Sequence, residues 1–366
     1  IKGQRGRLIL WGGDTYDGPS WPWTWAETIP EYPCATCGMP VIQFDTRSSS
    51  VEGAYPSRAA TQEVPFETGM AMAVMTTVSA VGAGESEIIA FGGADLAGQY
   101  SGSTWAARKG LIEDGMTGYL WQRLDAVGAP HSPPVLPAPR AYAVMVSSPD
   151  GGEVILFGGE DADGYFSDLW SLDPEAVAPG QKQYTWRELD SYGEIPSPRS
   201  RMVVAQFGGK ALIFGGMTDE GPTEEMYAFD IRSRYWEKIE TLPGGPGARV
   251  GASIEYDPWA KIMFLFGGED IAGLHNDLWK LDLGLGAWER VLPDCTSGSC
   301  PLPDRGSLLL RDPVTGSLTV LPADEGPTRD VYYVLGEHGW IGQAEYEGSS
   351  REGDCNGDGL PEAEHG

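Results

Sequence analysis

A short pattern recurs along this chain, and it constrains the fold more than any other feature of the sequence. An apolar run leads into a glycine pair, and an aromatic residue follows eleven or twelve positions after the second glycine. Because each copy of such a repeat is one supersecondary unit that stacks on its neighbours, the repeat decides the fold class before any single residue does. The glycine pairs are Gly12–Gly13, Gly92–Gly93, Gly158–Gly159, Gly215–Gly216 and Gly267–Gly268.

The residues around each glycine pair repeat as well. The spaced aromatics are Trp25, Trp105, Trp170, Tyr227 and Trp279, and the later tryptophans are Trp121, Trp186, Trp236 and Trp288. Upstream, an arginine opens a short apolar segment at Arg140, Arg199 and Arg249, whereas Met70 stands in that place in the second copy. Each unit therefore predicts four short strands, and the second strand runs into the glycine pair because the backbone turns there where a Cβ would clash.

A sixth, degenerate unit follows the same spacing without a glycine pair. Arg305 opens it, residues 318–321 supply the apolar run, Tyr332 takes the place of the spaced aromatic and Trp340 closes it. We therefore expect an all-β chain of six units. The repeated arginines are interpreted as structural, each held by salt bridges or hydrogen bonds to the loops of a neighbouring unit.

These residues resemble the kelch repeat, whose signature is an apolar strand ending in Gly-Gly, a spaced aromatic and a later Trp. The resemblance covers about residues 5 to 346, suggests a secreted bacterial type, and implies a six-bladed β-propeller of four-stranded blades around a central channel. Members of the family mostly bind partners through the loop-lined faces, and a minority are enzymes. The expected blades are about 1–50, 66–126, 140–190, 199–240, 249–292 and 305–346, followed by an acidic, Gly-rich tail at 347–366.

The first unit departs from this pattern. Only seven residues precede Leu8, too few for a full first strand. Either an N-terminal piece is missing, or the blade has three strands, or another chain fills its edge by strand addition. The unit is also lengthened by an insertion that contains Trp21, Trp23 and Trp25, which we treat as a candidate binding surface.

Charge and cysteine content indicate where such a chain works. The formal net charge of -28 opposes contact with nucleic acid or an anionic membrane surface, and no apolar run approaches the roughly 20 residues of a membrane span. Two closely spaced cysteine pairs, Cys34 with Cys37 and Cys295 with Cys300, predict local disulfides and an extracellular or cell-surface location. The alternative is one four-cysteine zinc site, which we disfavour because the pairs are expected on opposite faces.

The loops after the glycine pairs are acidic. Asp161, Asp163 and Asp270 belong to this set, which predicts a negative rim on one face that could attract cations or a basic partner. The alternative, which we favour, is that Asp and Gly recur there because they are good turn residues.

No catalytic residues are predicted. Oxidase-type members of the family need two His, two Tyr and a Cys at one channel mouth. Here His275 is expected in a loop after a second strand, His338 in a turn, His131 in a linker and His365 in the tail, so no two need converge. A carbohydrate or carbonyl oxidase-like enzyme is therefore the alternative hypothesis.

The tail contains a motif with its own chemistry. Oxygen donors recur at alternate positions around Gly359, as in calcium loops, although His365 replaces the bidentate Glu of an EF-hand. The predicted calcium ligands are Asp354, Asn356, Asp358, the Leu360 carbonyl and Glu362. The segment looks like the Asp-rich calcium repeats of extracellular proteins, and the alternative is a disordered polar tail.

Together these features predict an extracellular binding or assembly scaffold that recognises a protein or glycan through its loop faces, with calcium as the expected cofactor. A subunit of a surface polymer, joined by strand addition at the first blade, is a further alternative. The ligand, the organism, the completeness of the chain, the partner of Cys355 and the oligomeric state are not determined by the sequence.

Overall fold

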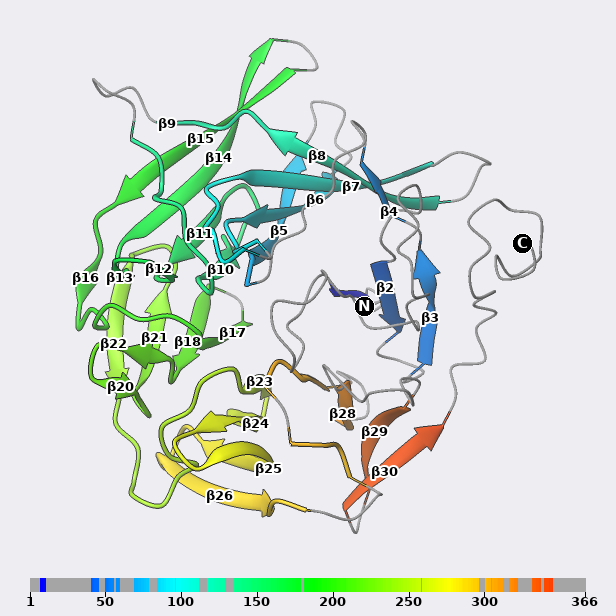
Figure 1. Ribbon diagram of the computed structural model, residues 1–366, viewed down its shortest axis with the longest axis vertical. Coiled ribbons are helices and arrows are strands. Elements are labelled where there is room, and N and C mark those ends of the chain that lie inside the picture. Colours follow the sequence, from blue (N-terminus) through cyan, green and yellow to red (C-terminus); the bar gives the residue numbers. More distant parts are fainter. Residues whose placement is uncertain are drawn as a thin grey trace.

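The structure, a computed structural model, is all-β over the residues that it describes (Figure 1). None of these residues belongs to a helix that is long and apolar enough to cross a membrane. The described residues are 7–10, 41–45, 50–55, 57–59, 69–78, 84–95, 97–111, 117–128, 135–178, 181–207, 209–257, 259–295, 300–303, 305–311, 316–321, 331–336 and 339–344.

Within this part of the chain, six sheets of three or more strands follow one another, and Figure 1 shows them arranged around a common centre. We call them blades 1 to 6. Blade 1 contains β1 (Arg7–Leu10), β2 (Val41–Asp45) and β3 (Ser50–Tyr55). Blade 2 contains β4 (Ser57–Ala59), β5 (Ala71–Val78), β6 (Gly84–Phe91), β7 (Thr104–Leu111) and β8 (Thr117–Leu124). Blade 3 contains β9 (Val127–Gly128), β10 (Val144–Ser147), β11 (Val154–Phe157), β14 (Leu169–Ala178) and β15 (Gln181–Leu189).

The second half of the chain continues the same order. Blade 4 contains β16 (Tyr192–Gly193), β17 (Val203–Phe207), β18 (Lys210–Phe214), β21 (Met226–Asp230) and β22 (Tyr235–Ile239). Blade 5 contains β23 (Ser253–Asp257), β24 (Ile262–Asp270), β25 (Gly273–Asp282) and β26 (Ala287–Leu292), and blade 6 contains β27 (Leu308–Arg311), β28 (Leu318–Leu321), β29 (Val331–Gly336) and β30 (Gly339–Ala344). Two-stranded hairpins extend blade 3 at β12 (Glu160–Asp161) and β13 (Gly164–Tyr165), and blade 4 at β19 (Met217–Thr218) and β20 (Gly221–Pro222).

Blades 2 to 6 each contain the four antiparallel strands that the repeat predicts. The prediction did not include a fifth strand that is present in three of them. In blades 2, 3 and 4 a short fifth strand, β4, β9 or β16, pairs in parallel with the outermost strand. Each of these strands belongs to the connection that arrives from the preceding blade. Such a strand occupies the backbone groups of an edge that would otherwise be open to pairing.

Blade 1 differs from the predicted arrangement. Its middle strand is Val41–Asp45 and its outer strand reaches Tyr55, beyond the boundary expected near residue 50. The spaced aromatic Trp25 lies outside the described residues, and the next described strand after β1 is β2. The long segment between β1 and β2 holds the insertion, so the spacing rule that holds in the other glycine-pair units does not apply here.

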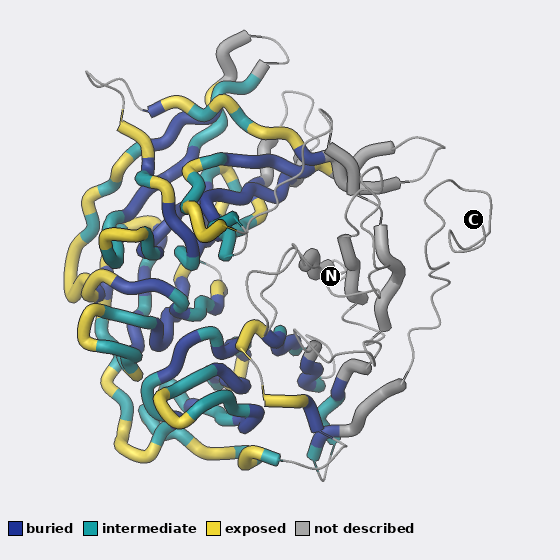
Figure 2. The backbone as a smooth tube through the Cα atoms, viewed as in Figure 1, coloured by how far each residue is buried: buried dark blue, intermediate teal, exposed yellow. Residues whose placement is uncertain are grey.

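The core lies between neighbouring blades, and one aromatic contact recurs at their junctions. The Phe just before a glycine pair packs against the closing Trp of the next blade, and the buried residues follow the strands that face each other (Figure 2). The four pairs are Phe91 with Trp186 (ring centroids 5.0 Å apart), Phe157 with Trp236 (4.7 Å), Phe214 with Trp288 (5.6 Å) and Phe266 with Trp340 (5.5 Å). Buried aromatic pairs of this kind contribute about 0.5–1.5 kcal/mol beyond their burial.

A buried carboxylate also joins blades 2 and 3. Glu87 is 1% exposed and accepts a 2.8 Å bond from Lys182 Nζ and a 2.6 Å bond from the Tyr184 hydroxyl. Burial and the hydrogen bond to Glu87 raise the pKa of Tyr184 to about 12. Arg108 of blade 2 also pairs with Glu87 at 2.8 Å, so the charge of Glu87 is compensated by one cation from each of the two blades.

The glycine pairs adopt backbone conformations that other residues avoid. In blades 2 to 5 the first glycine has φ between 64° and 74°, and the second has φ between 90° and 103°. A Cβ on Gly215 would lie 2.5 Å from the carbonyl oxygen of Arg249, which belongs to the next blade. The pairs therefore allow the backbones of two blades to approach each other.

We expect Gly215→Ala to destabilise the protein by at least about 1–2 kcal/mol, the usual cost of a left-handed conformation for an L-residue, because the new methyl also contacts Arg249 O. Gly152→Ala is the control, since its added Cβ meets only Asp150 Oδ1 at 3.7 Å. Chemical denaturation of both variants measures the difference. Equal stabilities would contradict the close backbone approach.

Candidate functional site

Three buried arginines connect the blades at the glycine-pair ends. In blades 2, 3 and 4 the second glycine of the pair donates its N–H to the carbonyl oxygen of the arginine that opens the next blade. These bonds run from Gly93 to Arg140 (2.8 Å), from Gly159 to Arg199 (2.9 Å) and from Gly216 to Arg249 (3.0 Å). The arginine backbone is therefore part of the junction with the preceding blade.

The arginine side chains turn into their own blades, which corrects the expectation that they reach a neighbouring one. Arg249 Nη1 donates to the Gly267 carbonyl at 3.0 Å, and Nη2 donates to Asp277 Oδ2 at 2.8 Å. The same pairing joins Arg140 to Asp168 and Arg199 to Glu225. The three arginines are 1%, 0% and 3% exposed at positions 140, 199 and 249, so each charge is compensated inside the fold.

The paired acids also hold the spaced aromatics. Asp277 Oδ2 accepts the indole N–H of Trp279 at 2.6 Å, and Glu225 Oε2 accepts the hydroxyl of Tyr227 at 3.2 Å. Burial raises the pKa of Glu225, but hydrogen bonds from Lys238 and Arg199 outweigh it and lower the pKa to about 2. An acid two residues before the aromatic is thus the sequence signal for the arginine's partner, and we did not assign it that role.

A chain of backbone hydrogen bonds links the inner ends of blades 2 to 6. Each N–H donates to the equivalent carbonyl of the preceding blade, at 2.7–3.2 Å. The bonds run from Tyr142 to Gly69, from Arg201 to Tyr142, from Gly251 to Arg201 and from Gly306 to Gly251.

This chain of bonds corrects two alignments. Gly69 is the equivalent of Tyr142, which lies two residues after Arg140. The arginine position of blade 2 is therefore two residues before Gly69, and Met70 does not occupy it. Gly306 takes the place of Gly251, so Arg305 lies one residue past the position of the buried arginines. Arg305 accordingly is half-exposed and pairs with Glu269 of blade 5 at 2.9 Å.

Two members of this chain of bonds are large residues in an unfavourable conformation. Tyr142 and Arg201 have φ of 55° and 54°, whereas the equivalent positions in blades 2, 5 and 6 are glycines. The Arg201 guanidinium lies 3.7 Å from the centre of the Tyr142 ring and pairs with Glu160 Oε1 at 2.9 Å. The sequence signal for both is a non-glycine two residues after a repeated arginine, which we missed.

The predicted acidic rim is partly a set of turn caps. Asp161 Oδ1 accepts the N–H groups of Asp163 and Gly164, and Asp270 Oδ1 accepts those of Ala272 and Gly273. These bonds satisfy the turns, as Asx turns do. Asp163 differs because it stands exposed at the hairpin tip.

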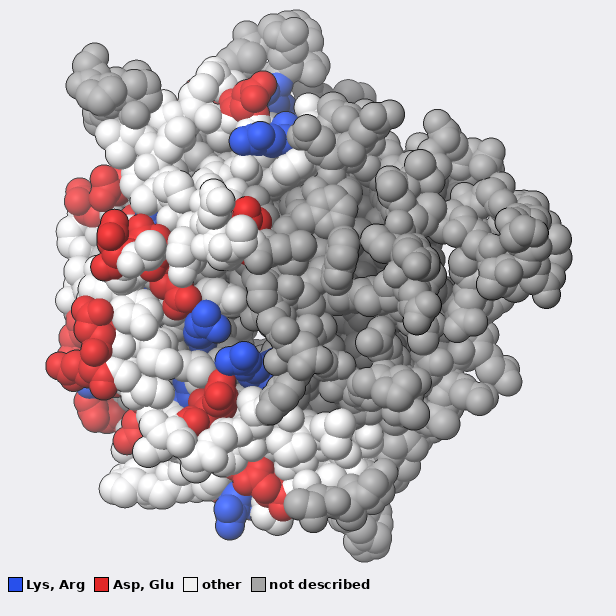
Figure 3. Space-filling view, viewed as in Figure 1, with Lys and Arg blue, Asp and Glu red and all other residues white. Residues whose placement is uncertain are grey.

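The hairpin tip of blade 4 is exposed and acidic too, at Asp219 and Glu220, and the tip of blade 5 presents Ile271, which is 96% exposed. The two arginines near the inner ends, Arg201 and Arg305, are each paired with a glutamate of the preceding blade. Figure 3 shows one face of the molecule, where acidic side chains gather along the outer edge near β16, β20 and β22, while Lys and Arg side chains are fewer and more scattered.

Several predicted site residues lie outside the described part of the chain. They are the aromatic cluster Trp21, Trp23 and Trp25, the pair Cys34 and Cys37, and the calcium ligands Asp354, Asn356, Asp358, Leu360 and Glu362. In chain order Cys34 and Cys37 fall between β1 and β2, the first two described strands of blade 1, and not after the third strand of a four-stranded unit.

The second cysteine pair is described. A disulfide joins Cys295 and Cys300 in the connection between β26 and β27. Its sulfurs are therefore not thiolates, and a four-cysteine zinc site would lack two of its ligands.

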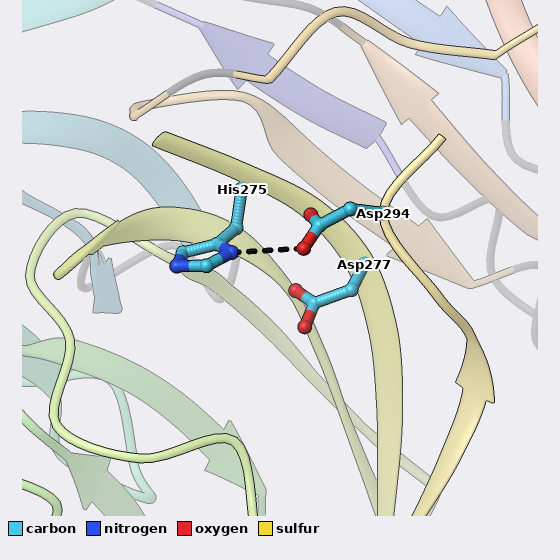
Figure 4. Close-up of side chains that lie close together, drawn as sticks. All are labelled: His275, Asp277 and Asp294. Carbon is cyan, nitrogen blue, oxygen red and sulfur yellow. Dashed lines mark hydrogen bonds and ion pairs between the residues drawn. The ribbon is translucent and has the colours of Figure 1, made fainter. Parts of the chain in front are cut away.

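His275 lies in β25 opposite Gly268 and not in a loop as expected. Figure 4 shows it beside Asp277 and Asp294, and ligand atoms of the three residues lie within 4.8 Å of one another. A metal ion would need a free oxygen of Asp277. Both of its oxygens accept hydrogen bonds from Arg249, whose charge would also repel a cation, so we interpret the cluster as an ion-pair network.

We expect Asp277→Asn to cost about 3–5 kcal/mol of stability, because it leaves the Arg249 charge buried without its carboxylate. Glu289→Gln in the same blade is the control, since its 3.0 Å pair with Lys280 is exposed and should contribute less than about 1 kcal/mol. Urea unfolding of both variants tests this difference. A small effect of Asp277→Asn would show that solvent reaches the arginine.

Comparisons with known proteins agree with the repeat pattern. The profile of the KLHDC2/KLHL20/DRC7 Kelch-repeats domain matches residues 79–311. The chain is 27% identical to leucine-zipper-like transcriptional regulator 1 of Mus musculus over 161 residues. These residues make up 42% of this chain and 18% of that protein. The chain is 26% identical over 229 residues to the Drosophila melanogaster homolog of that regulator, covering 60% and 21%.

A third relative is the dynein alpha chain of the flagellar outer arm of Chlamydomonas reinhardtii, 28% identical over 184 residues, which cover 47% of this chain and 4% of that protein. The matched part is thus less than a quarter of the length of each of these relatives. The likeness concerns one repeat region within larger proteins.

Proposed function

Because this chain belongs to the kelch-repeat family, we propose that it is a protein-binding scaffold whose six blades form one propeller and whose glycine-pair face binds a basic segment of a partner. The proposal concerns a surface and a class of partner, and no catalytic step is part of it. The alternatives of glycan recognition, an oxidase-like activity and a polymer joined at blade 1 are not favoured by any observation among the described residues.

The distribution of charge on the glycine-pair face supports a basic partner. The arginines at positions 140, 199 and 249 are buried against acids, and Arg201 and Arg305 are paired with Glu160 and Glu269. At the hairpin tips, Asp163, Asp219 and Glu220 are exposed to solvent, so their negative charges face outward. A negative surface of this kind raises the association rate of a positively charged partner.

The rigidity of the tips also supports a binding role. The turns of blades 3 and 5 are capped by Asp161 and Asp270, and the Thr218 hydroxyl donates to the Gly221 carbonyl at 2.9 Å in blade 4. A surface held in one conformation loses less conformational entropy on binding. Charge and rigidity together make these tips the best-supported contact points.

The role of the exposed acids at the hairpin tips, called the rim below, is tested by reversing their charge. We expect Lys/Arg-rich peptides from an array of basic, neutral and acidic sequences to bind the full chain, with affinity that falls as salt rises. The triple variant Asp163→Lys, Asp219→Lys, Glu220→Lys should weaken that binding by about tenfold or more, which corresponds to about 1.4 kcal/mol. Fluorescence anisotropy measures both affinities.

The control carries the same change of charge away from the rim. Glu188→Lys, Glu237→Lys and Glu289→Lys alter exposed acids on the outer strands β15, β22 and β26. This variant should retain most of the affinity. An equal loss of affinity in both variants would indicate attraction by net charge alone. If none of the basic peptides in the array bound, the proposed class of partner would be wrong.

We also propose an extracellular or cell-surface setting and a calcium-binding tail. The disulfide of Cys295 and Cys300 supports the first, since disulfides persist in oxidising compartments. The order of oxygen donors from Asp354 to Glu362 supports the second.

Calcium should raise the thermal midpoint of the tail-containing chain relative to a chelator-treated sample, because ligand binding to the folded state stabilises it. The double variant Asp354→Asn, Asp358→Asn should abolish the difference, whereas Asp163→Asn should leave it unchanged. Differential scanning calorimetry with metal analysis measures both. No bound calcium and no difference would remove calcium from the proposal.

A further inference from the structure

His275 lies between two acidic residues from separate segments of blade 5. Its Nδ1 makes a 3.1 Å hydrogen bond with Asp294 Oδ2 after β26, and its buried Nε2 lies 3.1 Å from Asp270 Oδ2 at the end of β24, an ion-pair contact without hydrogen-bond geometry. Figure 4 shows the first of these contacts. One imidazole ring thus lies between the tip of the β24–β25 hairpin and the connection from β26 to β27.

The protonation state of the ring decides whether both contacts can exist. A protonated imidazole donates from both nitrogens, whereas a neutral one donates from a single nitrogen and carries a lone pair on the other. An ionised carboxylate only accepts hydrogen bonds. Both contacts are therefore favourable only when His275 carries a positive charge, and loss of the proton sets a lone pair against one of the carboxylates.

The two carboxylates are positioned independently of the histidine. Asp294 Oδ1 accepts the backbone N–H of Asn276 at 2.8 Å, and Asp270 Oδ1 accepts the N–H groups of its own turn. Asn276 in turn bonds the Cys295 backbone in both directions and the Pro301 carbonyl. The β26–β27 connection is thus anchored on β25, which leaves the hairpin tip as the part that the histidine ties down.

The charged groups facing His275 come from every element packed around it. Asp270 belongs to β24, Asp277 to β25 and Asp294 to the following connection, while Arg249 precedes β23 and is paired with Asp277. Burial lowers the pKa of His275, but the contacts with the Asp294 and Asp270 carboxylates outweigh burial and the Arg249 charge, so the pKa is raised. Burial raises the pKa values of Asp270 and Asp294, but the backbone hydrogen bonds from Ala272 and Asn276, together with the contacts to His275, outweigh burial, so both pKa values are lowered.

We propose that His275 is a proton-controlled latch that ties the tip of the β24–β25 hairpin to the β26–β27 connection. The latch is closed when the histidine is protonated and both aspartates are ionised. The tip it controls carries the fully exposed Ile271 on the glycine-pair face, so the latch makes the shape of that face depend on pH. The latch itself exists whether or not a basic partner binds there.

The direction of the pH dependence follows from the shifts. The stabilisation from His275 is fully present below the ordinary histidine pKa of about 6.5 and is lost as the pH rises through its raised value. The aspartates, whose pKa values are lowered, contribute above about pH 3.9 and lose their contribution only in stronger acid. The latch is therefore closed in mildly acidic solution and opens on the alkaline side.

The titration of His275 in the full chain tests the latch directly. Imidazole ¹³C and ¹⁵N NMR signals, assigned with His275→Gln, should show a pKa above the ordinary value and two protonated nitrogens below it. Asp270→Asn and Asp294→Asn should each lower that pKa. Asp163→Asn, which removes an exposed acid from a different hairpin, should leave it unchanged.

Hydrogen exchange gives the second measurement. Protection of the Gly273 N–H should fall in the wild-type chain as the pH passes the measured pKa, after correction for intrinsic exchange, and should no longer step at that pH in His275→Gln. A His275 pKa at or below the ordinary value, or one that both Asn variants leave unchanged, would overturn the latch. Stoichiometric metal that is retained on purification and lost in His275→Gln would replace it with a metal site.

Discussion

The hydrogen bond from the second glycine of one blade to the arginine carbonyl of the next is the contact on which the rest of the structure depends. It brings two backbones so close that a Cβ at Gly92, Gly158 or Gly215 would meet that carbonyl oxygen at 2.2–2.7 Å. The bond places the arginine, and the arginine side chain then orders the end of its own blade through a carboxylate and a glycine carbonyl. Blades 2, 3 and 4 each make this bond to the blade that follows, so the same junction recurs three times among the described residues. The Phe–Trp contacts fill the space behind this junction and bury the apolar surface that stabilises it.

This network also explains the electrostatics of the face it builds. The repeated arginines at positions 140, 199 and 249 are buried and paired with acids, so they add little positive potential at the protein surface. The turns beyond the glycine pairs need Asp or Thr side chains to cap them, and the exposed tips add further acids. An acidic rim is thus partly a by-product of how the fold closes its turns, and the exposed Asp163, Asp219 and Glu220 are the part that remains available to a partner. His275 adds a titrating contact between two such elements.

The repeat spacing predicted the antiparallel strands of blades 2 to 6 well, including the degenerate sixth unit, whose strands Leu318–Leu321 and Val331–Gly336 lie where the spacing placed them. It failed where a residue's neighbours come from another blade. Met70 and Arg305 were aligned by residue type, whereas the hydrogen bonds align Gly69 and Gly306. The fifth strands were missed because parallel pairs of two or three residues leave no periodic pattern in the sequence. In blade 1, Trp25 matched the spacing by residue type, whereas the next described strand is Val41–Asp45.

The sequence by itself determined the repeating unit, the all-β class and the family, because alternating apolar runs, glycine pairs and spaced aromatics are local requirements of a four-stranded sheet that packs on its neighbours. It also determined the excess of negative charge. Only the tertiary structure decided which carboxylate pairs with which arginine, that Tyr142 and Arg201 adopt left-handed conformations, and that His275 lies between Asp270 and Asp294. These are contacts between segments many residues apart, and their partners depend on the register between blades and between loops. No local pattern encodes that register, because it is set by the packing of one sheet against the next.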